Sequence, residues 1–186
     1  MTHTSTITYL EMLSAPAKPS PPIPMQKIAV LRAHRPTLSF YRYLYGEVGR
    51  DWFWYERNIM ADTKLSALLA DDLVEIYVLY VGGVPAGYCE LDRRHKNDIE
   101  LAYFGLIPEF IGRGLGTYFL RWSIDMAWSY RPKKLWVHTC SEDHVNALPT
   151  YQKSGFEVYK QETIELNDPS ILQWMDKKSK GSNECG

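Results

Sequence analysis

The chain has 186 residues, 45% of them apolar and 13% aromatic, which suffices for one full-sized core but not for two comfortable domains. Its 21 Lys and Arg nearly balance its 22 Asp and Glu, so it lacks the basic field that nucleic-acid binding requires. The three cysteines form no CxxC pair, and there is neither a leader-like N-terminus nor an 18-residue apolar run. We therefore expect a cytoplasmic protein that binds neither nucleic acid nor membrane.

The N-terminal residues 1–26 predict a short strand followed by a proline-rich arm. The sequence ITYLEM at 7–12 alternates weakly, and SAPAKPSPPIP at 14–24 holds five prolines, which favour an extended backbone. We expect this arm to be a surface linker beside one domain at 27–176. The polar residues 177–186 predict a disordered tail.

The first half of the domain predicts a strand at 27–33, a helix at 37–49 and a second helix at 62–72. Between the helices, the sequence DWFWYERNIM at 51–60 carries four aromatic residues within its first five positions. Such a cluster is typical of a core plug, and it also suits the wall of a substrate pocket. Both interpretations remain open at this point.

The second half begins with two β-rich runs around Gly82-Gly83, which indicate a hairpin over 73–94. Both runs are apolar on both faces, as in the middle of a covered sheet. The remaining pattern predicts a strand at 97–108, a helix at 112–130, a strand at 133–140, a short helix at 144–155 and a strand at 156–166. This order predicts an α/β (α+β) fold with a mixed, mostly antiparallel sheet and helices on both faces.

A glycine-rich stretch, IGRGLG at 111–116, stands at the start of the long predicted helix. The free amide groups and the positive dipole of a helix start attract anions, and glycines remove the Cβ atoms that would hold a phosphate away. The stretch lacks the Gly-Lys-Ser/Thr of a P-loop and the spacing of a dinucleotide fold. A pyrophosphate is the anion that remains.

Residues 98–156 resemble the core of the GCN5-related N-acetyltransferases, the GNAT superfamily, whose signature is Gln/Arg-x-x-Gly-x-Gly/Ala between a central strand and its following helix. Gly114 and Gly116 match the two glycine positions. The sequence ALPTYQKSGF at 147–156 resembles the second stretch of the family, Ala-x-x-x-Tyr-x-x-x-Gly-Phe. The resemblance implies a GNAT-like sheet that splays between its fourth and fifth core strands.

The resemblance further implies that acetyl-CoA is the co-substrate. Its pantetheine arm is expected to run along Phe104 and Leu106, and Arg113 adds a cation beside the loop. The pyrophosphate is expected on the loop amides of Ile111, Gly112, Arg113, Gly114, Leu115, Gly116 and Thr117. The chain departs from the family pattern at Ile111, where Gln or Arg is usual, and at His144, where many members have Asn.

The reaction implied is direct acetyl transfer to a primary amine of a small molecule or peptide. Tyr151 occupies the position of the acid that protonates the leaving thiolate, and Glu100 is the candidate base, with Glu90 on the neighbouring strand as its rival. The alternative function is a non-catalytic acyl-CoA-binding sensor or interaction module. Whether the chain forms a homodimer is left open.

Three residues, His138, Cys140 and His144, raise the question of a metal or of a Cys–His nucleophilic pair. Their spacing matches no zinc pattern, and a cysteine in an apolar strand is usually an inert core residue. We therefore expect neither a metal site nor covalent catalysis by cysteine.

Overall fold

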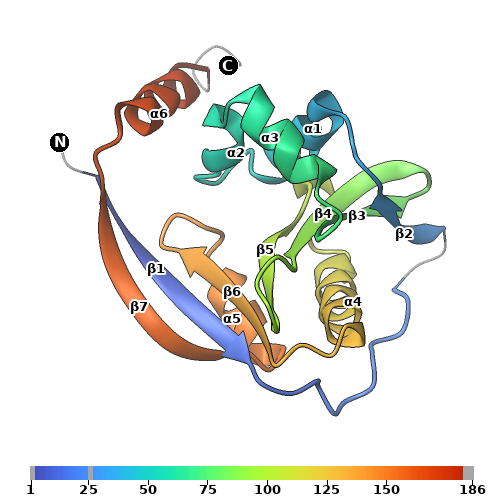
Figure 1. Ribbon diagram of the computed structural model, residues 1–186. Helices are drawn as coiled ribbons and strands as arrows, with labels where there is room; N and C mark the ends of the chain where they lie inside the picture. The colour runs from blue at the N-terminus through green and yellow to red at the C-terminus, as the bar shows by residue number, and fades with distance from the viewer. Residues whose placement is uncertain (1–2, 25–26, 182–186) are drawn as a thin grey trace.

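The computed structural model describes residues 3–24 and 27–181, and the elements below are those of this part of the chain (Figure 1). In chain order they are β1 (His3–Met12), β2 (Ile28–Ala33), α1 (Leu38–Val48), α2 (Glu56–Ile59), α3 (Asp62–Ala70), β3 (Val74–Val81), β4 (Val84–Asp92), β5 (Asp98–Leu106), a 3-10 turn (Pro108–Phe110), α4 (Leu115–Ser129), β6 (Lys134–Cys140), α5 (Ala147–Lys153), β7 (Glu157–Leu166) and α6 (Pro169–Gly181).

The strands form one sheet in the order β2-β3-β4-β5-β6-β1-β7. Every neighbouring pair is antiparallel except β5 and β6, which run parallel. The hairpin expected around Gly82 and Gly83 joins β3 to β4, and both glycines have positive φ. The predicted mixed, mostly antiparallel sheet with helices on both faces is confirmed.

Helices cover the two faces of the sheet and create two separate cores (Figure 1). On one face, α4 and α5 bury residues such as Phe119 and Tyr151 against the strands. On the other face, α1 and α3 bury residues such as Leu44 and Leu65. The apolar side of α4 faces the sheet, because Leu115 and Phe119 are fully buried. The result is a three-layer arrangement of helices, sheet and helices.

The parallel strands β5 and β6 separate soon after they begin. They are paired only at Asp98–Lys134, Ile99–Leu135 and Glu100–Trp136, and from Leu101 onward β5 has no partner on this side among the described residues. The pairing of β5 with β4 also shifts register between Leu101 and Tyr103, which marks a bulge at Ala102. The predicted splay between the fourth and fifth core strands is thus present at β5 and β6.

Strand β1 lies within the sheet, between β6 and β7 and antiparallel to both (Figure 1). The proline-rich residues that follow it run along α4, where Arg121 donates a hydrogen bond to the carbonyl of Lys18 and Ser20 donates to Asp125. The arm reaches the glycine loop at Pro24. The N-terminal segment is therefore built into both the sheet and the surface of α4.

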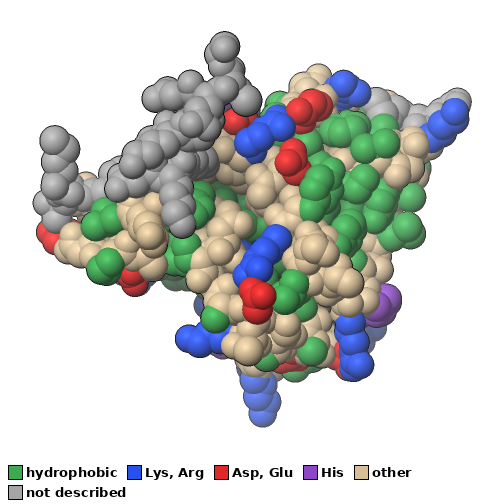
Figure 2. All heavy atoms as spheres, turned by 90° about the horizontal axis from the view of Figure 1, so that it is seen from above, with side chains coloured by type: hydrophobic (Ala, Val, Ile, Leu, Met, Phe, Trp, Pro, Cys, Tyr) green, Lys and Arg blue, Asp and Glu red, His purple; other side chains and the backbone are tan. Residues whose placement is uncertain are grey.

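Helix α6 extends through Gly181 and so includes part of the segment for which we expected disorder, whereas residues 182–186 lie outside the described part. None of the described helices is long and apolar enough to cross a membrane. Seen from above, acidic and basic side chains alternate on the visible face and gather into no patch of one sign (Figure 2).

Candidate active site

A cavity of about 580 Å³ passes through the sheet where β5 and β6 separate. On one side it is lined by Phe104 and Tyr151, which belong to the core under α4 and α5. On the other side it is lined by Tyr103 and Trp54, which belong to the core under α1 and α3. A molecule in this cavity can therefore be reached by groups from both faces of the sheet.

The glycine loop forms one end of the cavity. Gly112 and Gly114 have φ values of +82° and +74°, a conformation that glycine adopts readily, and Gly114 caps the N-terminus of α4. The amides from Gly112 to Thr117 donate to no acceptor in the described part of the chain. A Cβ added to Gly112 would meet open space, and one added to Gly116 would only touch Leu106 at 3.7 Å. These amides therefore form an open cradle for an anion.

The other residues of the loop differ in which of their groups reach the cavity. Ile111 is 45% exposed and lines the cavity, as does Thr117, whereas the side chain of Leu115 is buried in the core and leaves only its amide to the loop. The guanidinium of Arg113 lies over the ring of Phe110, 5.3 Å from its centre, and Arg113 is not among the residues that line the cavity. An anion at this end is thus met mainly by backbone amides.

The free edge of β5 connects the loop to the middle of the cavity. Phe104 and Leu106 line the cavity here, and this edge is not bonded to β6. Unpaired backbone groups at a strand edge can bind an extended chain of amides, as another strand would. The edge thus suits a linear ligand that leads away from the anion cradle.

The aromatic segment expected either in the core or in a pocket serves both purposes. Trp52, Phe53, Trp54 and Tyr55 all line the cavity, while Trp54 also packs on Tyr45 and Tyr103. Trp174 of α6 packs on Phe53, with 5.5 Å between the ring centres. The segment therefore forms the wall of the cavity on the α1 side and is fixed in place from behind.

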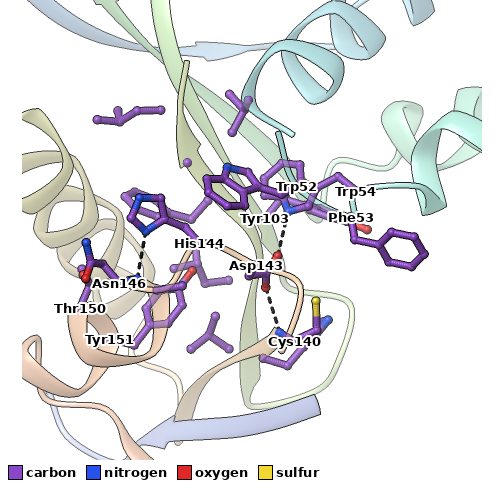
Figure 3. Close-up of a pocket in the computed structure, with 18 of the residues that line it drawn as sticks. Trp52, Phe53, Trp54, Tyr103, Cys140, Asp143, His144, Asn146, Thr150 and Tyr151 are labelled. Atoms are coloured by element: carbon purple, nitrogen blue, oxygen red, sulfur yellow. Dashed lines mark hydrogen bonds between the residues drawn. The ribbon is translucent and has the colours of Figure 1, made fainter. Parts of the chain in front are cut away.

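Asp143 ties this wall to the loop after β6 (Figure 3). Its carboxylate accepts a hydrogen bond from Trp54 Nε1 at 3.2 Å and others from Thr139 Oγ1 and the Cys140 amide at 2.8 and 2.9 Å. Next to it, the ring of His144 packs edge-on against Trp52 at 4.9 Å. The two sides of the gap between β5 and β6 are thus joined at this point.

Glu100 is paired with a histidine of the neighbouring strand. Its Oε1 lies 3.2 Å from Nδ1 of His138, and its side chain is 14% exposed. His138 lines the cavity, but Glu100 does not. Burial lowers the pKa of His138, yet contact with the Glu100 carboxylate and its charge raise it more, so the pKa lies above the usual value for histidine.

The rival carboxylate, Glu90, is fully buried and committed to other partners. Its Oε1 accepts a hydrogen bond from Arg57 Nη2 at 2.7 Å, and its Oε2 accepts one from the Tyr41 hydroxyl. Glu90 is also absent from the cavity lining. It therefore serves as a buried ion pair beneath α1.

Tyr151 projects from α5 into the cavity and is 7% exposed (Figure 3). Its ring packs edge-on against Phe156, with 5.9 Å between the centres. Burial and the charge of Asp143 raise the pKa of Tyr151, so its hydroxyl keeps its proton at neutral pH. No hydrogen bond ties this hydroxyl to another residue in the described part of the chain.

Cys140 also lines the cavity, but burial and the charge of Asp143 raise its pKa to about 12. The nucleophilic thiolate is thus scarce at neutral pH.

His144 accepts a hydrogen bond from the Asn146 amide at 3.0 Å. Within residues 3–24 and 27–181 no group of three or more His, Cys, Asp or Glu is arranged to hold a metal ion.

Sequence reasoning missed three polar groups of this cavity: His138 as the partner of Glu100, Glu56 and Asp143. Strand alternation places His138 on the same face of β6 as Trp136, but the pairing with Glu100 depends on the short parallel contact between the strands. Glu56 begins the four-residue helix α2 and Asp143 stands in the loop after β6, and both segments are too short for a periodic pattern to indicate which way a side chain points.

Comparison with known proteins agrees with this geometry. The model of the Acetyltransferase (GNAT) family matches residues 29–156, and the chain belongs to this family. GNAT acetyltransferases use acetyl-CoA, for which the cavity offers an anion cradle and a free strand edge. No curated relative matches the sequence significantly.

Solved structures show the same fold at low sequence identity. A conserved protein of unknown function from Staphylococcus epidermidis has a TM-score of 0.62 at 18% identity; the match covers 87% of this chain but only 61% of that protein. A GNAT-family acetyltransferase from Elizabethkingia anophelis, solved with acetyl-CoA bound, has a TM-score of 0.56 at 19% identity, covering 73% and 80% of the two chains. An IAA acetyltransferase from Bacillus cereus has a TM-score of 0.55 at 18% identity, covering 75% and 99%.

Proposed function

We propose that the protein is an N-acetyltransferase that moves an acetyl group from acetyl-CoA directly to a primary amine of a small molecule or peptide. The observation that carries this proposal is one continuous cavity that crosses the sheet between β5 and β6. It joins an anion cradle on the α4 side to a wall of aromatic residues on the α1 side. Two substrates can thus enter from opposite faces and meet at the strand gap.

Acetyl-CoA is assigned to the α4 side. Its pyrophosphate is held by the free amides from Gly112 to Thr117 and by the positive end of the α4 dipole, whereas the Ile111 amide, which we had also expected here, donates to the Pro108 carbonyl at 3.1 Å. Its pantetheine arm lies along the β5 edge at Phe104 and Leu106. Because backbone amides make the cradle, Ile111 in place of a polar residue weakens this binding without abolishing it.

His138 acts as the base, and Glu100, the base expected from sequence, positions it. The Glu100 carboxylate lies 3.2 Å from Nδ1 of His138, which leaves Nε2 as the nitrogen that can take a proton from a ligand in the cavity. The incoming ammonium gives one proton to His138, and the neutral nitrogen then attacks the thioester carbonyl carbon. Glu100 is therefore a positioning residue, and His138 is the residue that touches the substrate.

Tyr151 acts as the acid. As the carbon–sulfur bond breaks, the Tyr151 hydroxyl donates its proton to the departing sulfur, and the phenolate regains a proton from the nitrogen that has become an amide. Its raised pKa keeps this proton available at neutral pH. The net products are the N-acetylated amine, free CoA and one proton.

Two assays separate the enzyme from a non-catalytic acyl-CoA sensor. Acetyl-CoA raises the melting temperature in both cases, since it binds the folded state. Only the enzyme releases free thiol when a panel of small amines, amino acids and peptides is added. Tyr151→Phe should slow this release on the order of 10²-fold while leaving acetyl-CoA binding heat intact. Binding without thiol release from any acceptor would favour the sensor, and no binding would contradict both functions.

A further inference from the structure

The acceptor side of the cavity is apolar and aromatic over most of its surface. The consecutive rings of residues 52–55 form its wall, and Ile7 of β1 with Ile164 and Leu166 of β7 line it further on. Strands β1 and β7 thus extend the cavity beyond the chemistry at His138. A hydrocarbon body of an acceptor would be buried here.

The charged groups on this side are carboxylates. Glu56 and Asp143 line the cavity, and neither Lys nor Arg is among the described residues that do so. The nearby arginines have carboxylate partners of their own. Arg57 lies over the ring of Tyr103 at 4.9 Å but is paired with Glu90 at 2.7 Å, and Arg50 is paired with Glu109 at 2.8 Å. The acceptor side therefore carries negative charge without a fixed cation of its own.

The hydrogen bonds to these two carboxylates come from neutral donors, so no cation of the described residues offsets either carboxylate directly. Glu56 accepts a hydrogen bond from the Tyr103 hydroxyl and has no ion-pair partner among the described residues. Asp143 accepts its hydrogen bonds from Trp54, Thr139 and the Cys140 amide. The charges of Glu56 and Asp143 also raise the pKa of His138, which agrees with a negative potential in the cavity.

This arrangement discriminates between amines by the other charged groups that they contain. An ammonium gains from the carboxylates and from the faces of the aromatic rings. A carboxylate next to the amine, as in an amino acid, would meet Glu56 and Asp143 without a cation to compensate. A second ammonium, as in a diamine, would have to be desolvated among Ile7, Ile164 and Leu166.

We propose that the acceptor is an apolar primary monoamine with an aromatic or similar hydrocarbon body and no carboxylate. Glu56 attracts its ammonium, and its body packs on the rings of residues 52–55 and towards Leu166. This inference rests on the proposed N-acetyl transfer and narrows its substrate class. The role of Glu56 is to set specificity, whereas His138 and Tyr151 carry the proton transfers.

The test compares three amines in the thiol-release assay with the full chain: 2-phenylethylamine, phenylalanine, which adds only a carboxylate, and putrescine, which replaces the ring by a second amine. We expect kcat/KM for 2-phenylethylamine to exceed both others on the order of 10²-fold, because the added carboxylate is repelled and the added ammonium is left without a partner. Equal or better turnover of phenylalanine or putrescine overturns this inference and leaves N-acetyl transfer standing. Binding of acetyl-CoA without transfer to any amine overturns both.

Substitutions at Glu56 give a second, independent readout. Glu56→Gln keeps an oxygen for the Tyr103 hydroxyl but removes the charge, so KM for 2-phenylethylamine should rise about tenfold while acetyl-CoA affinity stays the same. Glu56→Lys should reduce the preference for 2-phenylethylamine over phenylalanine, because the lysine supplies a cation for the carboxylate of phenylalanine. The control is Glu157→Gln, at an exposed position outside the cavity, which should change neither constant. An unchanged preference in both Glu56 variants contradicts the proposal.

Discussion

Nδ1 of His138 on β6 lies 3.2 Å from Oε1 of Glu100, which is the last residue of β5 that is paired with β6. The contact raises the pKa of His138 even though burial alone would lower it. Since a base must be neutral to accept a proton, kcat/KM should rise with pH as His138 loses its proton. The midpoint of that rise should lie at a pH above the usual pKa of histidine.

Replacing Glu100 by Gln should move this rise to lower pH, because the variant removes the carboxylate that favours protonated His138. The measurement is the pH dependence of kcat/KM for one amine with wild type and variant. His138→Gln should lower kcat on the order of 10²-fold without loss of acetyl-CoA affinity. A pH profile unchanged in Glu100→Gln would show that the pair has only a structural role.

Substitutions in the glycine loop should weaken acetyl-CoA binding more than they destabilise the fold. Gly116→Ala places a Cβ in ordinary contact with Leu106 at 3.7 Å, so folding should be preserved while acetyl-CoA affinity, measured calorimetrically, falls about tenfold. Gly114→Ala should also lower the free energy of unfolding by about 1–2 kcal/mol, because Gly114 has φ of +74°.

The matched control for the loop is Gly46→Ala in α1, where a Cβ meets no atom within 4 Å. It should raise the free energy of unfolding by up to about 1 kcal/mol, as alanine does in a helix, and leave acetyl-CoA affinity unchanged. Unaltered affinity in Gly116→Ala would mean that the pyrophosphate binds elsewhere.

The ion pair between Glu90 and Arg57 should matter for stability and not for proton removal. Arg57→Met leaves the fully buried Glu90 carboxylate without its cation and should lower the free energy of unfolding by about 3–5 kcal/mol in urea. Glu90→Gln should also destabilise, but with the pH midpoint of kcat/KM in its wild-type position. A shifted midpoint in Glu90→Gln, with none in Glu100→Gln, would make Glu90 the base.

The local parts of this fold were predictable from sequence, since they depend on short patterns. The hairpin at Gly82 and Gly83, the glycine loop before α4 and the tyrosine on α5 each have a signal within a few residues. The helix at 112–130 begins at Leu115 because Gly112 and Gly114 adopt positive φ, which ordinary helix periodicity does not reveal.

Long-range placement was not predictable in the same way. Strand β1 pairs with β7, about 150 residues later in the chain, and a weak alternation at 7–12 does not indicate which strand will be its neighbour. The same is true of the contact between Glu100 and His138, which needs the register of a parallel pair. Arg113 was expected to add a cation beside the glycine loop, but its guanidinium lies over the ring of Phe110.

The most direct test of the central claim is the position of the transferred acetyl group on tyramine, an apolar compound with both a primary amine and a hydroxyl. The chain is incubated with isotope-labelled acetyl-CoA and tyramine, and the product is identified by mass spectrometry while thiol release is followed. We predict N-acetyltyramine in a one-to-one ratio with free CoA, formed much more slowly by the Tyr151→Phe variant. An O-acetyl ester, or free CoA without acetylated tyramine, would contradict N-acetyl transfer as the activity of this cavity.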